Sequence, residues 1–231
     1  MREYRTGEIQ TENVLRSGVL CCGVLRRNPC FLFFVFLFVF SVSLYAETFS
    51  FKADKMSGSR ATGKEVLILS GSAEVHSDSI ILKAEHIEIQ GADNEFIDCS
   101  GNVWGLEEEK NIIFRTDRLR YDRTQKIARL EGDSTLEDRN NEVVVKGRFI
   151  EYNDGNETAV FQVAVRLFKE SIVCRSEYAV YKRDEQLLDL SGFPVVFKDD
   201  DEFRADRIRV DLDTEDVSME GTVSGSIKGD D

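Results

Sequence analysis

After residue 46, apolar residues alternate with polar ones along most of the chain, as in β-strands that bury one face. Leu67 and Leu69, for example, lead with this spacing into Gly71. Clusters rich in Asn, Asp and Gly separate the alternating segments, and this composition is typical of turns. No segment of this part has a helical period. The pattern therefore predicts an all-β fold.

The alternation recurs six times at intervals of about 30 residues. Each copy has a four-residue anchor: a small residue, a second residue that is usually an acid, a third residue of any kind and an apolar fourth residue. The six anchors are Ala53–Met56, Ala84–Ile87, Thr116–Leu119, Gly147–Ile150, Ser176–Ala179 and Ala205–Ile208. A second anchor is a glycine, with Gln162 in the one vacant place: Gly71, Gly101, Gly132, Gly192 and Gly221. A fixed period of this size indicates one supersecondary unit stacked many times. Two strands per repeat predict about twelve strands.

The side of the strand that is apolar changes at the small–acid pair. Ile80, Leu82 and Ala84 precede one pair two residues apart, but Ile87 and Ile89 follow it after a step of three. Such a slip turns every later side chain to the wrong face unless the backbone bulges or turns a corner there. Aligned bulges curl a sheet. We therefore expect two facing antiparallel sheets, or one sheet folded into a V, elongated along the stacking direction. The pattern leaves open whether the interior is filled or forms a groove.

The fourth repeat is irregular. Its apolar residues Phe161, Val163, Val165 and Leu167 lie one place out of register with the other repeats. Either the strand has a local bulge here or the alignment of this repeat is shifted, or the strand presents an outward apolar stripe to a partner.

Residues 1–46 differ sharply from the rest. Arg26 and Arg27 precede the apolar run Phe31–Phe40, and a small residue, Ala46, comes before the first acid of the following segment. These features are typical of an export signal, and we expect cleavage after Ala46. An uncleaved signal anchor is the alternative. The prediction is a single domain over 47–231 in the periplasm, or alternatively one anchored in the inner membrane and facing the periplasm.

Charge and cysteine content limit the possible partners. Residues 1–46 hold five arginines and three acids of the 30 basic and 43 acidic residues in the chain, so 47–231 carry a net charge of −15. A surface this acidic repels phosphate backbones, which argues against nucleic-acid binding. Cys99 and Cys174 lie about five predicted strands apart, too far for a disulfide, and we expect buried free thiols.

No set of residues indicates catalysis or a bound metal. The acids of the small–acid anchors are expected to cap exposed backbone N–H groups. The run Asp199–Glu202 lacks the spacing of a calcium loop, and two histidines, His76 and His86, on the polar faces of their strands make a poor metal site. We predict no catalytic residue, no metal, no cofactor and no enzymatic activity.

The glycine motifs and the small–acid anchors resemble those of the OstA-like family from about Phe49 to Ile227. The glycine motifs are Gly101-Asn102-Val103 and its variants Gly71-Ser72-Ala73 and Gly221-Thr222-Val223. That family includes a periplasmic lipopolysaccharide-transport bridge protein and its membrane-anchored partner. The resemblance implies an antiparallel β-jelly-roll groove that receives acyl chains. It also implies relatives joined edge to edge in a bridge between the inner and outer membranes. This chain departs from the pattern at Gln162, at Arg148 and in its acidity.

The expected function is to shield the acyl chains of lipopolysaccharide or a related glycolipid during transport to the outer membrane. The expected partners are that lipid, other jelly-roll transport components paired by strand edges, and copies of this chain joined head to tail. A cell-envelope structural protein with a filled core and no lipid is the alternative, and an exported polysaccharide-active enzyme is a weaker one. The expected groove-lining residues are Leu67, Leu69, Ile87, Ile89, Ile97, Leu119, Tyr121, Leu130, Ile150, Tyr152, Leu188, Leu190, Ile208 and Val210.

Overall fold

The computed structural model describes residues 50–77 and 79–228, so the predicted export signal at 1–46 lies outside the described residues. Residues Ala46–Asp231 form one compact unit, and its described elements are all strands. They are β1 (Ser50–Lys52), β2 (Lys55–Ser59), β3 (Val66–His76), β4 (Ile80–Gln90), β5 (Phe96–Glu107), β6 (Ile112–Asp122), β7 (Ile127–Asp138), β8 (Val143–Asn153), β9 (Thr158–Lys169), β10 (Ile172–Lys182), β11 (Leu187–Ser191), β12 (Val195–Lys198), β13 (Asp201–Arg204), β14 (Arg207–Asp211), β15 (Val217–Glu220) and β16 (Ser224–Ser226).

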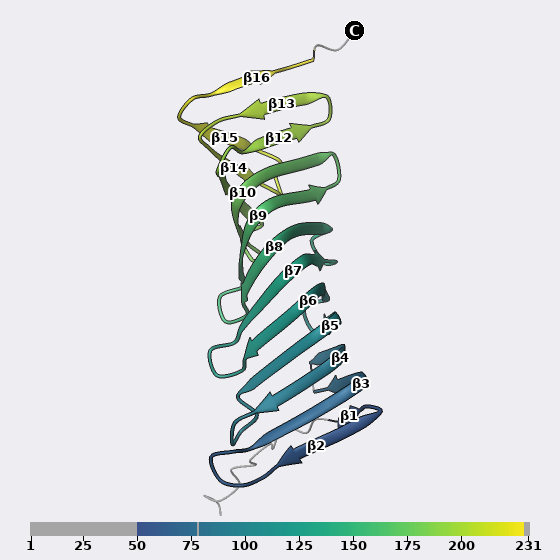
Figure 1. Cartoon of the computed structure of the whole chain (residues 1–231). Coiled ribbons are helices and arrows are strands. Elements are labelled where there is room, and N and C mark those ends of the chain that lie inside the picture. The colour runs from purple at the N-terminus through teal and green to yellow at the C-terminus, as the bar shows by residue number, and fades with distance from the viewer. Residues whose placement is uncertain (1–49, 78, 229–231) are drawn as a thin grey trace, which may run out of the picture. The chain divides into compact units, whose positions relative to one another are not determined.

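All sixteen strands belong to one antiparallel sheet, in which β3 to β11 follow one another in chain order (Figure 1). This confirms the predicted antiparallel all-β fold. The sixteen strands occupy twelve strand positions, as expected, because four of these positions are each interrupted and hold two short strands. Four strand positions break at their corner, into β1 with β2, β11 with β12, β13 with β14, and β15 with β16. One break contains Pro194, which has no N–H to donate to the sheet.

The long strands turn a corner where the small–acid pairs predicted it. The pairing of β4 with β5 shifts register between Lys83 and His86, around Ala84 and Glu85. Corresponding shifts occur between all the other successive strands from β3 to β10. On the two sides of its corner, β10 pairs with β11 through Tyr178–Lys182 and with β12 through Ile172–Arg175. Each strand therefore contributes one half to each of two facing halves of the sheet.

Glycine and acid fit together at these corners. Gly132 has a φ of +103°, which side chains on L-residues strongly disfavour. A Cβ atom there would also lie 2.1 Å from Asp117 Oδ2. That carboxylate accepts a hydrogen bond from the backbone N–H of Asp133 at 3.2 Å, and Asp206 accepts one from Thr222 at 3.0 Å. The expectation that the anchor acids cap exposed N–H groups is confirmed at these two corners.

The fourth repeat loses its glycine and its acid together. Gln162 pairs with Phe149 and Tyr178. Ser100, the residue before Gly101, pairs with the corresponding residues of its own neighbouring strands. Gln162 therefore lies one residue before the corner. The position of the missing glycine belongs to Val163, with a φ of +66°, and the prediction that Gln162 fills it is wrong. Here the facing acid is replaced by Arg148. Val163 is 49% exposed while Phe161, Val165 and Leu167 are buried, at the places that Cys99, Val103 and Gly105 take around Gly101. The repeat is thus in register once Val163 is aligned with the glycines, which confirms the alternative of a shifted alignment.

Replacing Val163 by glycine is expected to stabilise the protein. A left-handed conformation costs a β-branched residue roughly 1–2 kcal/mol, of which the entropy of glycine in the unfolded chain offsets up to about 1 kcal/mol. Urea denaturation should therefore show a small rise in the free energy of unfolding. The double variant Val163→Gly/Arg148→Asp should gain more than the sum of the single variants, because the acid fits only beside glycine. Additive effects would contradict this coupling.

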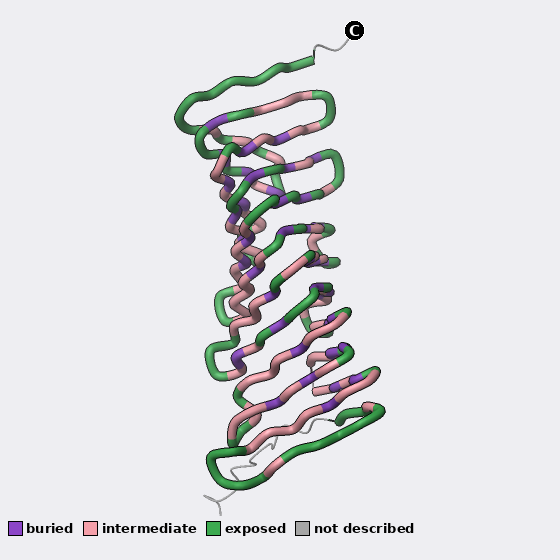
Figure 2. Tube along the Cα trace, viewed as in Figure 1, coloured by how far each residue is buried: buried purple, intermediate pink, exposed green. Residues whose placement is uncertain are grey.

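The apolar core runs along the inside of both halves. Buried residues alternate with half-buried or exposed ones along the strands (Figure 2). Cys99 and Cys174 are both buried free thiols, as predicted. Among the residues that the structure describes, no helix is long and apolar enough to cross a membrane.

Candidate functional site

A cavity of about 230 Å³ lies between the two halves of the sheet over strands β3 to β8. Its walls include Val75, Leu82 and Phe114 from one half, and Leu119 and Tyr121 from the other. Gly105 helps to shape the wall, because a Cβ atom there would lie 1.9 Å from the ring of Phe114. The cavity exceeds the volume of about 150 Å³ at which an apolar protein cavity accepts a benzene-sized molecule. It can therefore accept an apolar group.

Polar side chains surround this apolar interior. Ser77, Ser79 and Asn94 lie at the turns, together with the basic residues Arg123 and Lys126. The Arg123 guanidinium donates to the backbone oxygens of Asp93 and Asn94 at 3.0 and 3.4 Å. Lys126 is exposed. With the acids Glu107 and Asp154, which also line the cavity, its lining holds two positive and two negative charges.

The structure brings together six of the fourteen residues expected to line a groove. These six line the cavity: Ile89, Ile97, Leu119, Tyr121, Leu130 and Tyr152. Seven others are buried in the core: Leu69, Ile87, Ile150, Leu188, Leu190, Ile208 and Val210. Leu67 is half-buried against that core. The interior is open over β3 to β8, where the cavity lies. It is filled over β9 to β14, where the interior side chains pack together.

Tyr152 places a buried hydroxyl at the end of the cavity. Its Oη atom is buried with no hydrogen-bond partner among the described residues. Burial raises the pKa of Tyr152 to about 12, although the positive charge of Lys110 acts in the opposite direction. The Lys110 ammonium lies 6.0 Å from the centre of the tyrosine ring. A polar atom left unpaired in a cavity wall is a candidate contact for a ligand oxygen.

Replacing Tyr152 by phenylalanine is expected to raise the free energy of unfolding of the empty protein by about 1 kcal/mol, because an unpaired buried hydroxyl costs about 1–3 kcal/mol. Urea denaturation at pH 7 measures this change. Tyr121→Phe is the matched control, since Tyr121 lines the same cavity. A loss of stability in Tyr152→Phe would mean that the hydroxyl has a partner.

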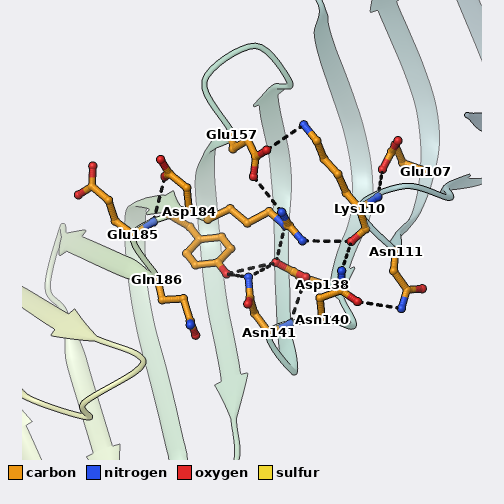
Figure 3. A network of polar contacts seen from close by, with 12 residues as sticks. Glu107, Lys110, Asn111, Asp138, Asn140, Asn141, Glu157, Asp184, Glu185 and Gln186 are labelled. Carbon is orange, nitrogen blue, oxygen red and sulfur yellow. Dashed lines mark hydrogen bonds and ion pairs between the residues drawn. The ribbon is translucent and has the colours of Figure 1, made fainter.

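A network of charged side chains, drawn in Figure 3, includes the cavity-lining residues Glu107 and Asp154. It joins the two edges of the folded sheet: edge 1, with the turns after β4, β6, β8, β10 and β14, and edge 2, with the turns after β3, β5, β7, β9 and β12. Lys110 on edge 2 places its Nζ atom 2.5 Å from Asp154 Oδ1 and 3.3 Å from Glu157 Oε1 on edge 1. Burial lowers the pKa of Lys110, but the hydrogen bonds to Asp154 and Glu157 outweigh it and the net shift is upward.

Arg183 makes the second crossing in the opposite direction. From edge 1, its Nε atom lies 2.9 Å from Asp138 Oδ2, and its Nη1 atom lies 2.8 Å from Glu157 Oε2. Its Nη2 donates to the backbone oxygen of Lys110 at 3.1 Å. Asp138 is fully buried, and it also accepts hydrogen bonds from the Asn141 side chain and the Tyr181 hydroxyl. We call Lys110, Asp138, Asp154, Glu157 and Arg183 the clasp.

The sequence contained no signal for the clasp. Its cross-edge contacts join residues 44 to 73 positions apart. The segments Asn153–Asn156 and Lys182–Glu185 have ordinary turn compositions, which indicate solvated loops. Only the fold brings their charges together.

The described residues contain no group of three or more His, Cys, Asp or Glu side chains placed to hold a metal ion. The clasp acids are engaged by Lys110 and Arg183. What the site offers chemically is an apolar cavity with a polar rim.

Three comparisons place the chain among known proteins. Residues 47–189 match the family model described as OstA-like protein. No curated protein matches the sequence. Among solved structures, the chain is similar to the crystal structure of LptH from Pseudomonas aeruginosa, described as the LptA homologous periplasmic component of the conserved lipopolysaccharide transport device. The identity is 12% and the TM-score is 0.29, over 79% of this chain and 96% of that chain. Since the family model covers more than half of its residues, the chain belongs to the OstA-like protein family.

Proposed function

We propose that this protein shields the acyl chains of lipopolysaccharide or a related glycolipid during transport between the inner and outer membranes. The observation that carries the proposal is the apolar cavity between the two halves of the sheet, with its polar rim. Membership of the OstA-like family supports it. The function is passive binding with no catalytic step.

The physical basis is the cost of exposing an acyl chain to water, about 0.8 kcal/mol per methylene. The cavity walls remove that exposure, while the rim leaves a head group in water. Arg123 and Lys126 at the rim offer positive charge to a phosphorylated head group. Glu107 and Asp154 line the same cavity, so its lining carries two basic and two acidic side chains.

The ends of the sheet offer surfaces for assembly. Within the described residues, β1 and β2 pair only with β3, β15 pairs only with β14, and β16 pairs only with β13. Unpaired strand edges recruit further strands unless they are protected. Edge-to-edge pairing with other jelly-roll transport components, or head to tail with copies of this chain, would extend the shielded path. We place the protein in the periplasm, either free or held at the inner membrane by its N-terminal segment.

A structural protein of the cell envelope is the second candidate. The packed interior of β9 to β14 favours it, since Phe161, Leu167 and Leu188 there are fully buried. In that case the cavity over β3 to β8 binds nothing.

Photo-crosslinking in cells that produce the full chain distinguishes the two candidates. A photo-reactive residue in place of Leu119, in the cavity wall, is expected to give an adduct with lipopolysaccharide. The same residue in place of Ile150, which is fully buried in the core, is the control and is expected to give none. A folded Leu119 variant without any lipid adduct would favour the structural candidate.

A further inference from the structure

The clasp lies where the cavity stops. Asp154 and Glu107 both line the cavity, and Glu107 accepts a hydrogen bond from the backbone N–H of Lys110 at 2.6 Å. Tyr152, under the Lys110 ammonium, lines it as well. The cavity end is therefore built from the clasp and its immediate neighbours.

Beyond the clasp the two halves of the sheet stay joined. Lys169 on edge 2 donates to Gln186 on edge 1 at 3.0 Å. Lys198, at the end of β12, contacts Glu215 in the turn after β14 at 2.9 Å. Phe161, which pairs with Ile150 of β8, is fully buried between these crossings and the cavity. An acyl chain in the cavity can advance toward β9 only if the two edges separate.

We propose that the clasp is a gate that divides the lipid path. This inference rests on the proposed function and concerns how the same path is regulated. In the closed state, the clasp confines an acyl chain to the cavity over β3 to β8. When Lys110 leaves Asp154 and Glu157, the edges separate at the cavity end about the retained Arg183–Asp138 pair, and the chain reaches the interior beyond β8.

The chemistry of the clasp suits a reversible gate. Lys110 retains a side-chain exposure of 20%, and its partners Asp154 and Glu157 retain 29% and 30%, so water reaches this side of the clasp. Asp138, in contrast, has no exposure and stays paired with Arg183. Lys110 is therefore the moving part, and Arg183 with Asp138 is the hinge side of the clasp.

Tyr152 gives a ligand the means to bias the gate. A ligand shifts a conformational equilibrium only through different affinities for its two states. The unpaired Tyr152 hydroxyl at the gate can bond to an ester, amide or hydroxyl oxygen of a lipid once that oxygen reaches the cavity end. An acylated lipid, unlike a plain hydrocarbon, thus has a polar group that can contact the clasp end of the cavity.

The test compares Lys110→Met with Lys198→Met in the full chain. Both variants remove a lysine that joins the two edges, but only Lys110 lies beside the cavity. Two nitroxides report the edge separation, carried on p-acetylphenylalanine at Glu109 and Asn156, which are both exposed. A photo-reactive phenylalanine at Phe114 reports lipopolysaccharide in the cavity, and one at Phe161 reports it beyond the clasp.

We expect Lys110→Met to lengthen the nitroxide distance and to raise the ratio of Phe161 to Phe114 adducts about fivefold or more, the effect of a coupling of ordinary size. Lys198→Met should leave both readouts as in the wild type. Lys110→Arg retains the cation and should stay closed. Asp154→Asn removes the carboxylate 2.5 Å from Lys110 and should open the gate, which keeps the test valid if Lys110→Met does not fold. Phe114 adducts with an unchanged ratio, or an equal response in Lys198→Met, would overturn the gate. Absence of the Phe114 adduct in every variant would instead overturn the proposed lipid function.

Discussion

Replacing Arg183 by methionine is expected to lower the free energy of unfolding by about 3–5 kcal/mol, because it leaves a buried carboxylate without its counter-charge. The carboxylate is Asp138, which is fully buried and lies 2.9 Å from Arg183 Nε. Its hydrogen bonds to Asn141 and Tyr181 remain, but neither partner supplies a positive charge. Urea denaturation of the purified full chain at pH 7 measures the loss.

Two further variants show whether the buried charge is the cause. Arg183→Met/Asp138→Asn removes both charges and should recover most of the lost stability. Arg129→Met removes a comparable contact, 2.8 Å from Glu151, but both side chains there are more than one-third exposed. Its cost should not exceed about 1 kcal/mol. Equal losses in Arg183→Met and Arg129→Met would show that the clasp contributes no more than a surface ion pair.

Stability is expected to fall steeply between about pH 9 and 12. Burial raises the pKa of the Cys99 and Cys174 thiols from 9.0 to about 12, and that of Tyr152 from 10.0 to about 12. The folded protein therefore retains protons that the unfolded chain releases. The resulting stability is fully present below pH 9 and is lost as the pH rises toward 12. By pH 11, each thiol accounts for a loss of about 3 kcal/mol, a large part of the stability of a typical domain.

Urea denaturation from pH 7 to 11 under reducing conditions measures this slope. In the Cys99→Ala/Cys174→Ala variant the decline should begin about one pH unit higher, where Tyr152 of the unfolded chain begins to ionise, and it should be shallower. A wild type whose stability does not change between pH 8 and 10.5 would contradict the burial of the two thiols.

The sequence predicts the backbone plan of this protein well, because that plan depends on local periodicity. The two-residue alternation located the strands, and the change of parity around Ala84 and Glu85 located the corner that the register shift confirms. The prediction of free thiols at Cys99 and Cys174 followed from strand counting. Each of these inferences uses residues close together in the sequence or a repeat of fixed length.

The remaining features depend on exact register and on distant contacts. One residue separates Gln162 from Val163, and the composition of β9 offers no glycine to mark which of them turns the corner. The cavity cannot be distinguished from the packed core by pattern, since Leu119 and Ile150 occupy the same place in their repeats but only Leu119 lines the cavity. The clasp joins Lys110 to residues 44 and 73 positions away through turns of ordinary composition.

Mass spectrometry of the lipid extracted from the purified full chain tests most directly whether the cavity holds an acyl chain. Ala128 lines the cavity and pairs with Tyr121 and Tyr152 on either side, so Ala128→Phe should fill the space between them. Ala159→Phe is unsuitable as a control because Ala159 is buried in the core, whereas Gln125→Phe adds the same ring at an exposed turn. We predict that the wild type and Gln125→Phe carry acylated glycolipid and that a folded Ala128→Phe carries little. Equal amounts in all three proteins, or none in the wild type, would contradict a lipid-binding cavity.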